Sequence, residues 1–184
     1  MLASAYTMRA AIDAKLGKVD QGLTDSKRAL SLLPDNYARS IRTGIIAWQA
    51  GQIRVANDNF SYAISQGRTG IFAWLWHALA TLRMGAAVPK QDLPNYDTKN
   101  WPAPIVAYFI GNAGRDAVFA AAGEGEDAVT RGKICEANFY VGEWLLQHHD
   151  LAGARPMIQK AATDCPTNFE EWSPAQMELA GFTR

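Results

Sequence analysis

The residues in this chain with the clearest chemical potential are two neighbouring histidines, His148 and His149, followed by Asp150. Imidazole and carboxylate groups bind divalent metals, but two histidines on one helix face the same ion only when they lie three or four positions apart. Adjacent helical residues point about 100° apart, so this pair does not converge on one ion. We therefore interpret 148–150 as a solvated turn between two helices.

No other segment carries a recognisable catalytic set. The one glycine-rich run, 123–126, alternates glycine with glutamate, and its negative charge opposes the binding of phosphate. No spacing identifies a nucleophile, a base and a group that orients the base. We expect a protein without catalytic residues, cofactor or metal.

Composition limits the class of protein further. The chain has 184 residues, is 48% hydrophobic and carries 18 basic and 18 acidic residues. Because no stretch gathers basic residues on one helical face, the electrostatic signature of nucleic-acid binding is missing. No apolar run approaches the roughly 20 residues of a membrane span, and the first 15 residues read as a helix with no visible signal peptide.

Small residues, glycines and prolines recur with a period of 34 residues in copies that start at Ala3, Tyr37 and Ile71, and again in a copy that starts at Cys135. The recurring positions are 8, 15, 20, 24, 27 and 32 of each copy. They are occupied by Ala10, Gly17, Gly22, Ala29 and Pro34; by Gly44, Gly51, Ala56, Phe60 and Ala63; by Ala78 and Gly85; and by Gly142, Ala154, Ile158, Ala161 and Pro166. This pattern resembles the helix-turn-helix consensus of the tetratricopeptide repeat (TPR).

Each recurring residue type has a steric role. Small residues at positions 8, 20 and 27 let two antiparallel helices approach closely, glycine at 15 turns the chain in a left-handed conformation, and proline at 32 ends the second helix. We predict an all-α, TPR-like superhelix with an irregular connector and a C-terminal capping helix. The alternative is an ordinary helical bundle.

The pattern predicts a single domain over residues 1–184. Its expected parts are repeats at 3–36 and 37–70, a partial repeat at 71–85, a connector and short helices at 86–125, a repeat at 135–168 and a capping helix at 169–182. The expected helices cover 3–16, 19–33, 37–50, 53–66, 70–84, 102–111, 114–125, 126–147, 151–163 and 169–182.

The second half of the chain has a more specific resemblance, carried by the runs IFAWLWHALATLRMG, NWPAPIVAYFIGN, CEANFYVGEWLLQHHDLAGARPMIQKA and CPTNFEEWSPAQMELAGF. Over about residues 71–182 these runs resemble the bacterial new lipoprotein I family of TPR proteins. The resemblance implies a homodimeric, lipid-anchored adaptor of the periplasm or cell envelope that docks a protease and cell-wall hydrolases. No lipobox cysteine is visible, so the expected localisation depends on the resemblance and on a possible disulfide.

That disulfide would join the two cysteines, Cys135 and Cys165. Cys135 opens the first helix of the fourth copy and Cys165 closes the second, and the ends of antiparallel helices lie side by side. A bond there would close a loop of about 30 residues, stabilise the fold by roughly 3 kcal/mol and indicate an oxidising compartment. The alternative is two reduced, partly buried thiols.

Function in a TPR fold lies on the concave face, at positions 2, 5, 9, 12 and 13 of each first helix. The first copy places Ser4, Thr7, Ala11, Ala14 and Lys15 at these positions, and the second copy places Ala38 at position 2. Thr7, Ala11 and Ile41 replace the basic and amide groups with which chaperone-tail receptors bind a terminal carboxylate, so that function is disfavoured.

In the second and third copies the concave face is apolar, which suits an amphipathic helix or an extended apolar peptide. The candidate partner-binding residues are Ile41, Ile45, Trp48, Phe72, Leu75, Trp76 and Leu79. We expect a protein-interaction adaptor that binds a protein or peptide. The alternatives are a structural module that forms a homodimer through this face, or a face covered by the protein's own C-terminal helices.

The sequence also indicates which tryptophans lie at an interface or in the core, and where His77 lies. Trp48 and Trp76 are the better interface candidates, and the core is expected to hold Trp74, Trp101 and Trp144. His77 falls at position 7 of the third copy, where the consensus has a buried leucine. We therefore expect its ring to be buried and hydrogen-bonded to the backbone.

Overall fold

The computed structural model describes residues 1–67 and 70–182, and every regular element in these ranges is helical. The all-α class is therefore confirmed. The chain divides into two compact units, Met1–Pro94 and Asn95–Arg184, and the boundary lies inside the expected connector. The organisation of residues 1–184 as one domain stays a prediction, so each unit is described separately.

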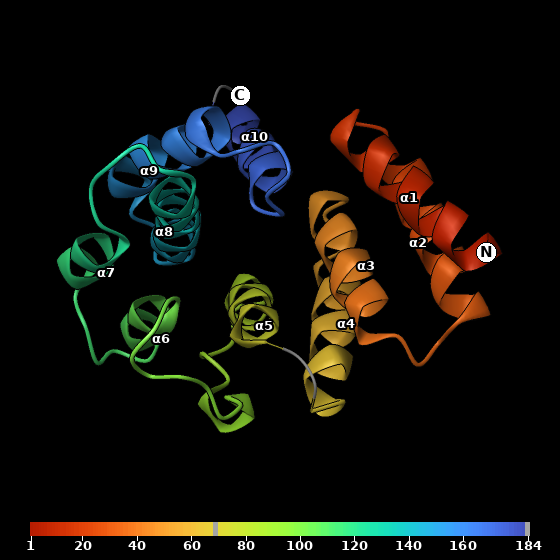
Figure 1. Cartoon of the computed structure of the whole chain (residues 1–184), viewed down its shortest axis with the longest axis horizontal. Helices are drawn as coiled ribbons and strands as arrows, with labels where there is room; N and C mark the ends of the chain where they lie inside the picture. The colour runs from red at the N-terminus through yellow and green to blue at the C-terminus, as the bar shows by residue number, and fades with distance from the viewer. Residues whose placement is uncertain (68–69, 183–184) are drawn as a thin grey trace. The chain divides into compact units, whose positions relative to one another are not determined.

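The described residues of the first unit form five α-helices and a short 3-10 helix (Figure 1): α1 (Leu2–Lys15), α2 (Val19–Leu32), α3 (Tyr37–Gln49), α4 (Ile53–Ser65), α5 (Ile71–Arg83) and η1 (Lys90–Asp92). The α-helices begin and end within one residue of the expected bounds. α1 packs on α2, α3 on α4, and each pair contacts the helix that follows it.

The second unit contains α6 (Ala103–Phe109), α7 (Arg115–Ala122), α8 (Ala128–Gln147), α9 (Leu151–Asp164) and α10 (Trp172–Gly181). α8 and α9 form its largest helix pair, α10 packs on α9, and α6 and α7 contact α8 (Figure 1). α8 begins at Ala128 because the Asp127 carboxylate caps it, accepting hydrogen bonds from the backbone N–H groups of Val129 and Thr130 at 3.0 Å. The capping helix starts at Trp172, three residues later than expected.

The link after the first helix of each copy has the same backbone conformation. Position 15 of the four copies has a positive φ, 76° at Gly17, 69° at Gly51, 80° at Gly85 and 62° at His149. Only glycine adopts this left-handed conformation without strain, so the period seen in the sequence reflects a repeated backbone requirement.

The connector between the helical segments packs on α5. The Trp74 indole N–H donates to the Pro89 carbonyl at 3.1 Å, and His77 Nε2 lies 3.3 Å from Asp92 Oδ2. His77 is buried as expected, but its partner is a carboxylate and not the backbone. The sequence could not indicate this, because the partner comes from a 3-10 turn that the connector was not expected to form.

Candidate functional site

The predicted partner-binding residues do not form an open surface. Ile41 and Phe72 are half-buried, and the other five are buried: Ile45, Trp48, Leu75, Trp76 and Leu79. A partner could contact these five side chains only after they were uncovered.

The packing of the two expected interface tryptophans explains their burial. The rings of Trp48 and Trp76 meet edge to face with their centroids 5.7 Å apart, and Phe60 stacks on Trp76 at 5.8 Å. The Arg83 guanidinium lies 3.8 Å from the centroid of the Trp48 ring. These contacts place both tryptophans in the core. Trp74 is also buried, as expected, whereas two other tryptophans expected in the core, Trp101 and Trp144, are half-exposed.

The histidine pair lies in the turn between α8 and α9, and its residues are exposed. The His148 ring stacks on Trp144 with centroids 4.2 Å apart, and its Nδ1 lies 2.7 Å from the Trp144 carbonyl oxygen. The Asp150 carboxylate caps α9 by accepting from the Gly153 N–H at 2.9 Å. In the described ranges no group of three or more His, Cys, Asp or Glu side chains could hold a metal ion.

Cys135 lies inside α8 and does not open the helix as the sequence predicted, because α8 already begins at Ala128, whereas Cys165 directly follows α9. Cys135 and Cys165 are joined by a disulfide, with their Cα atoms 4.9 Å apart. This bond connects the middle of α8 to the residue that follows α9, and it leaves no free thiol in the chain.

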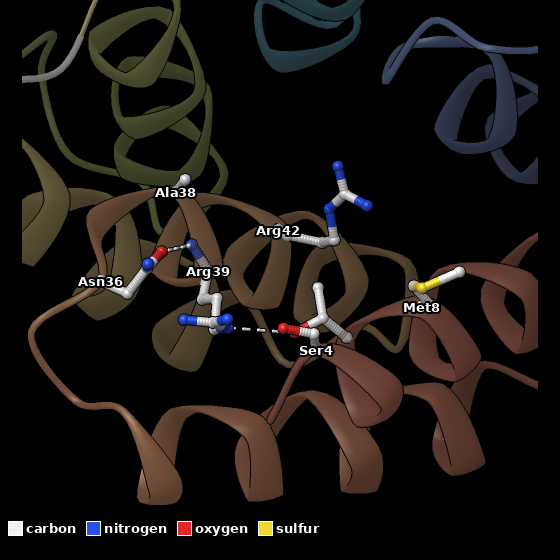
Figure 2. Close-up of a pocket in the computed structure, with 7 residues that line it drawn as sticks. Ser4, Met8, Asn36, Ala38, Arg39 and Arg42 are labelled. Carbon is white, nitrogen blue, oxygen red and sulfur yellow. Dashed lines mark hydrogen bonds between the residues drawn. The ribbon is translucent and has the colours of Figure 1, made fainter. Parts of the chain in front are cut away.

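An open pocket of about 290 Å³ lies between α1 and α3 in the first unit (Figure 2). Both helices contribute side chains, and the residues that line it are Ser4, Thr7, Met8, Asn36, Ala38, Arg39 and Arg42. Three of them, Ser4, Thr7 and Ala38, occupy expected concave-face positions. The pocket therefore lies at one end of the face on which binding was expected.

Local hydrogen bonds hold one of its two arginines in place. The Asn36 side chain caps α3 by accepting from the Arg39 backbone N–H at 2.9 Å. The Arg39 side chain reaches from α3 toward α1 (Figure 2). Its Nε donates to Thr7 Oγ1 at 3.2 Å. Thr7 Oγ1 in turn donates to the Ala3 carbonyl at 2.9 Å. This chain of bonds orients the Arg39 guanidinium at the edge of the pocket.

The pocket lining is positively charged. Arg39 and Arg42 lie three positions apart on α3, and no carboxylate is among the residues that line the pocket. Guanidinium groups bind carboxylates through two parallel hydrogen bonds, so this arrangement suits an acidic group on a peptide. Sequence reasoning missed both arginines because they occupy positions 3 and 6 of the copy, which lie outside the expected concave-face set. Their spacing on one helix was the available signal.

The second unit holds a cluster of two acids, of which Glu171 is buried and Glu136 is half-buried. The Trp101 indole N–H donates to Glu136, and the Tyr140 hydroxyl donates to Glu171 Oε1 at 3.0 Å. Burial raises the pKa of Glu136 to about 7. Burial, together with the nearby charge of Glu136, raises the pKa of Glu171 to about 8. The cluster joins α8 to the start of α10, so its protonation bears on how that helix is held.

Comparison of the chain with models of known protein families finds no match. Among the helices that the structure describes, none has both the length and the apolarity required to cross a lipid bilayer.

Proposed function

We propose that this protein is a TPR-like interaction module whose first unit binds a segment of a partner protein and holds it near other proteins. The fold assignment is supported by the left-handed residue at position 15 of all four copies. It is also supported by the order in which successive helices pack in the first unit. Helical repeats of this kind present extended surfaces for binding.

The observation that carries the binding role is the pocket between α1 and α3. It combines expected concave-face residues with two arginines, and its lining is accessible without rearrangement of the core. Ser4 and Thr7 add hydroxyl groups, which donate and accept hydrogen bonds. The lining offers positive charge and hydrogen bonds, and it suits recognition of a polar or acidic peptide group.

The apolar residues proposed from the sequence take a different part in this proposal. Ile41 and Phe72, which are half-buried, remain direct candidates for partner contact. The five buried residues support the shape of the unit. Self-association remains a second candidate, because α1 exposes the apolar side chains of Met8 and Ile12.

The cellular setting follows from the resemblance to the new lipoprotein I family and from the disulfide between Cys135 and Cys165. Both favour the periplasm or cell envelope, because disulfides persist in oxidising compartments. A protease or a cell-wall hydrolase is the proposed partner.

An affinity capture from bacterial envelope and cytosolic extracts tests the binding role. The wild-type chain is compared with Arg42→Glu, which reverses a charge in the pocket, and with Arg28→Glu, which makes the same change at an exposed arginine of α2 outside it. We expect a partner retained by the wild type and by Arg28→Glu but lost from Arg42→Glu. The same set of retained proteins with all three chains would contradict the proposal.

A further inference from the structure

The segment 165–171 connects α9 to α10, and its two ends are attached to α8 in different ways. At the first end, Cys165 is bonded covalently to Cys135. At the other end, the Glu171 carboxylate accepts a hydrogen bond from the Tyr140 hydroxyl at 3.0 Å. The disulfide fixes Cys165 to α8 under all conditions that leave the bond oxidised. The position of α10 beyond it therefore depends on non-covalent contacts.

Two further contacts hold α10 and the segment before it. The Gln176 side-chain amide donates to the Ala162 carbonyl at 2.6 Å and so satisfies an oxygen near the end of α9. The Phe169 ring lies against Gly132 of α8, where a Cβ atom on the glycine would come within 2.8 Å of it. Neither contact involves an ionisable group. Of these attachments, the hydrogen bond of Glu171 is the one on which a change of pH acts.

The surroundings of the Glu171 carboxylate favour its neutral, protonated form. Glu171 is 4% exposed, and the Tyr140 side chain that donates to it is fully buried. Among the described residues, the charges that act on Glu171 are those of Glu136 and Glu170, which are both acidic. The acid within α10, Glu178, lies two turns further along that helix. The charged side chains of α9 are exposed: Arg155, Lys160 and Asp164.

Ionisation of Glu171 therefore has a large cost while α10 is in place. A buried carboxylate that loses its proton also loses its hydration, and here the nearby charges repel it. The Tyr140 hydroxyl is a neutral donor, and burial raises its pKa well above the ordinary value, so it does not replace a cation.

Glu136 adds a second acid to the same cluster. It lies one turn before Tyr140 on α8, is half-buried and accepts a hydrogen bond from the Trp101 indole N–H. The charge of Lys133, one turn earlier on α8, does not act on the Glu136 carboxylate. Ionisation of both acids would thus place two uncompensated negative charges close together. They can separate if α10 carries Glu171 away from α8.

We propose that α10 is a proton-controlled latch on α9, which is closed while Glu171 is protonated and opens about Cys165 when Glu171 and Glu136 ionise. Opening breaks the hydrogen bond between Tyr140 and Glu171 and transfers the Glu171 carboxylate to water. It also exposes the Ala162 carbonyl and the adjoining surface of α9 to solvent. Because the disulfide keeps α8 and α9 together, the change is confined to residues 166–182. The latch belongs to the second unit and does not depend on the binding role proposed for the first.

The direction of the response follows from the two protonation states. In the closed state, burial raises the pKa of Glu171 from 4.5 to about 8 and that of Glu136 from 4.5 to about 7. In the open state the Glu171 carboxylate is hydrated and has its ordinary pKa. Between these values the closed state holds a proton that the open state has released, so each rise of one pH unit favours opening by up to about tenfold per acid.

Hydrogen exchange of the backbone amides, followed by mass spectrometry on the full oxidised chain, measures the opening of each helix separately. The rates are divided by the intrinsic exchange rates at each pH, which gives protection factors. From about pH 6 to about pH 8 we expect the protection of α10 to fall by at least about tenfold. The protection of α9 at residues 151–158 should stay within about twofold, because the disulfide still holds this helix on α8.

Variants assign the response to the two acids. Glu171→Gln should hold α10 at pH 8 as firmly as at pH 6, because the amide can accept from the Tyr140 hydroxyl and has no proton to lose. Glu136→Gln removes the second charge and should reduce the fall in protection. The matched control is Glu124→Gln, at an exposed position before α8, which should behave as the wild type does. Circular dichroism at pH 6 checks that each variant keeps its helical content.

Three results would overturn the inference. The first is a protection of wild-type α10 that does not change with pH. The second is an equal loss of protection in α9 and α10, which would mean that the acids destabilise the whole second unit and do not release one helix. The third is a pH dependence in Glu171→Gln that equals that of the wild type. The first two results need only the wild-type chain, so they decide the matter even if a variant fails to fold.

Discussion

Gly44 of α3 lies directly against the aromatic ring of Phe60 in α4, where a Cβ atom on the glycine would come within 2.5 Å of Phe60 Cε1. The same relationship recurs in the second unit, where a Cβ on Gly142 of α8 would lie 2.9 Å from Cδ1 of Ile158 in α9. Both pairs occupy positions 8 and 24 of their copies. In two separate helix pairs, therefore, a glycine provides the space into which a large side chain of the second helix packs.

Replacing Gly44 by alanine is expected to destabilise the chain. The added methyl group would overlap the buried ring of Phe60, and overpacking of this kind costs about 1 to 3 kcal/mol. The better helix propensity of alanine offsets about 1 kcal/mol of that cost. Urea unfolding of Gly44→Ala measures the net loss.

Two further variants control that experiment. Gly181→Ala, at the last residue of α10, meets no atom within 4 Å and should not lower the unfolding free energy. Phe60→Leu combined with Gly44→Ala should lose less than the two single variants added together, because the smaller side chain relieves the overlap. Strict additivity would show that the contact with Phe60 is not the cause.

The left-handed residue at position 15 gives a second prediction. Substitutions there should change the unfolding free energy in opposite directions in two of the copies. His149 has a φ of 62°, so His149→Gly should raise the unfolding free energy by about 1 kcal/mol by relieving backbone strain. Gly51 has a φ of 69° and open space around its Cα, so Gly51→Ala should lower the unfolding free energy by a similar amount through strain alone. Denaturant midpoints of the two variants measure both effects, and equal midpoints would contradict the prediction.

The helices were predictable from sequence because their limits depend on local steric rules. Glycine at position 15, as in Gly17 and Gly51, ends the first helix of its copy. Pro34 and Pro166 follow the last turn of α2 and α9. The 3-10 turn η1 had no such signal. It is held by contacts with Trp74 and His77 of α5, and tertiary contacts of this kind do not produce a local pattern.

The binding surface was less predictable than the fold. The consensus identifies which face of a first helix is concave, but it does not say which side chains the rest of the chain covers. Trp48 and Trp76 are buried by contacts with Phe60 and Arg83, which lie elsewhere in the sequence. Arg39 and Arg42 each lie one residue away from an expected concave position. They line the pocket only because α1 and α3 are close in space, which the consensus does not specify.

The burial of the apolar candidates leads to a third prediction. If Ile45 and Leu75 lined an open groove, Ile45→Asp and Leu75→Asp would abolish binding and preserve helicity, but both side chains are buried. An unpaired carboxylate at either position costs several kcal/mol, so both variants should lose helical content or unfold at much lower denaturant concentration. Arg42→Glu should keep the wild-type circular dichroism spectrum. Retention of full helicity by Ile45→Asp and Leu75→Asp would show that these residues face solvent.

The disulfide gives a fourth prediction, which thiol chemistry can check. Protein purified without reductant and unfolded in guanidinium should show no reactive thiol, because Cys135 and Cys165 are joined. Replacing both cysteines by serine opens a loop of 30 residues and should lower the unfolding free energy by about 3 kcal/mol. Two reactive thiols in the unreduced protein would contradict the bond and remove its support for an oxidising compartment.

Glu136 and Glu171 of the second unit should make stability depend on pH in an unusual direction. Glu171 has a pKa raised from 4.5 to about 8, mainly by burial, and the pKa of Glu136 is raised to about 7. Between about pH 4.5 and pH 8 the folded chain therefore holds protons that the unfolded chain has released. Because the native state binds more protons in this window, the contribution of these groups to the unfolding free energy decreases as the pH rises.

Thermal unfolding measured between pH 5 and pH 8.5 tests this dependence. The melting temperature of the wild type should fall across the window, whereas Glu171→Gln should show a shallower fall. The glutamine keeps an oxygen that can accept from the Tyr140 hydroxyl, but it has no proton to lose. Glu124→Gln, at an exposed position before α8, should follow the wild type. The same dependence of melting temperature on pH in Glu171→Gln and the wild type would contradict the prediction, because Glu171 would then ionise in the folded chain without loss of stability.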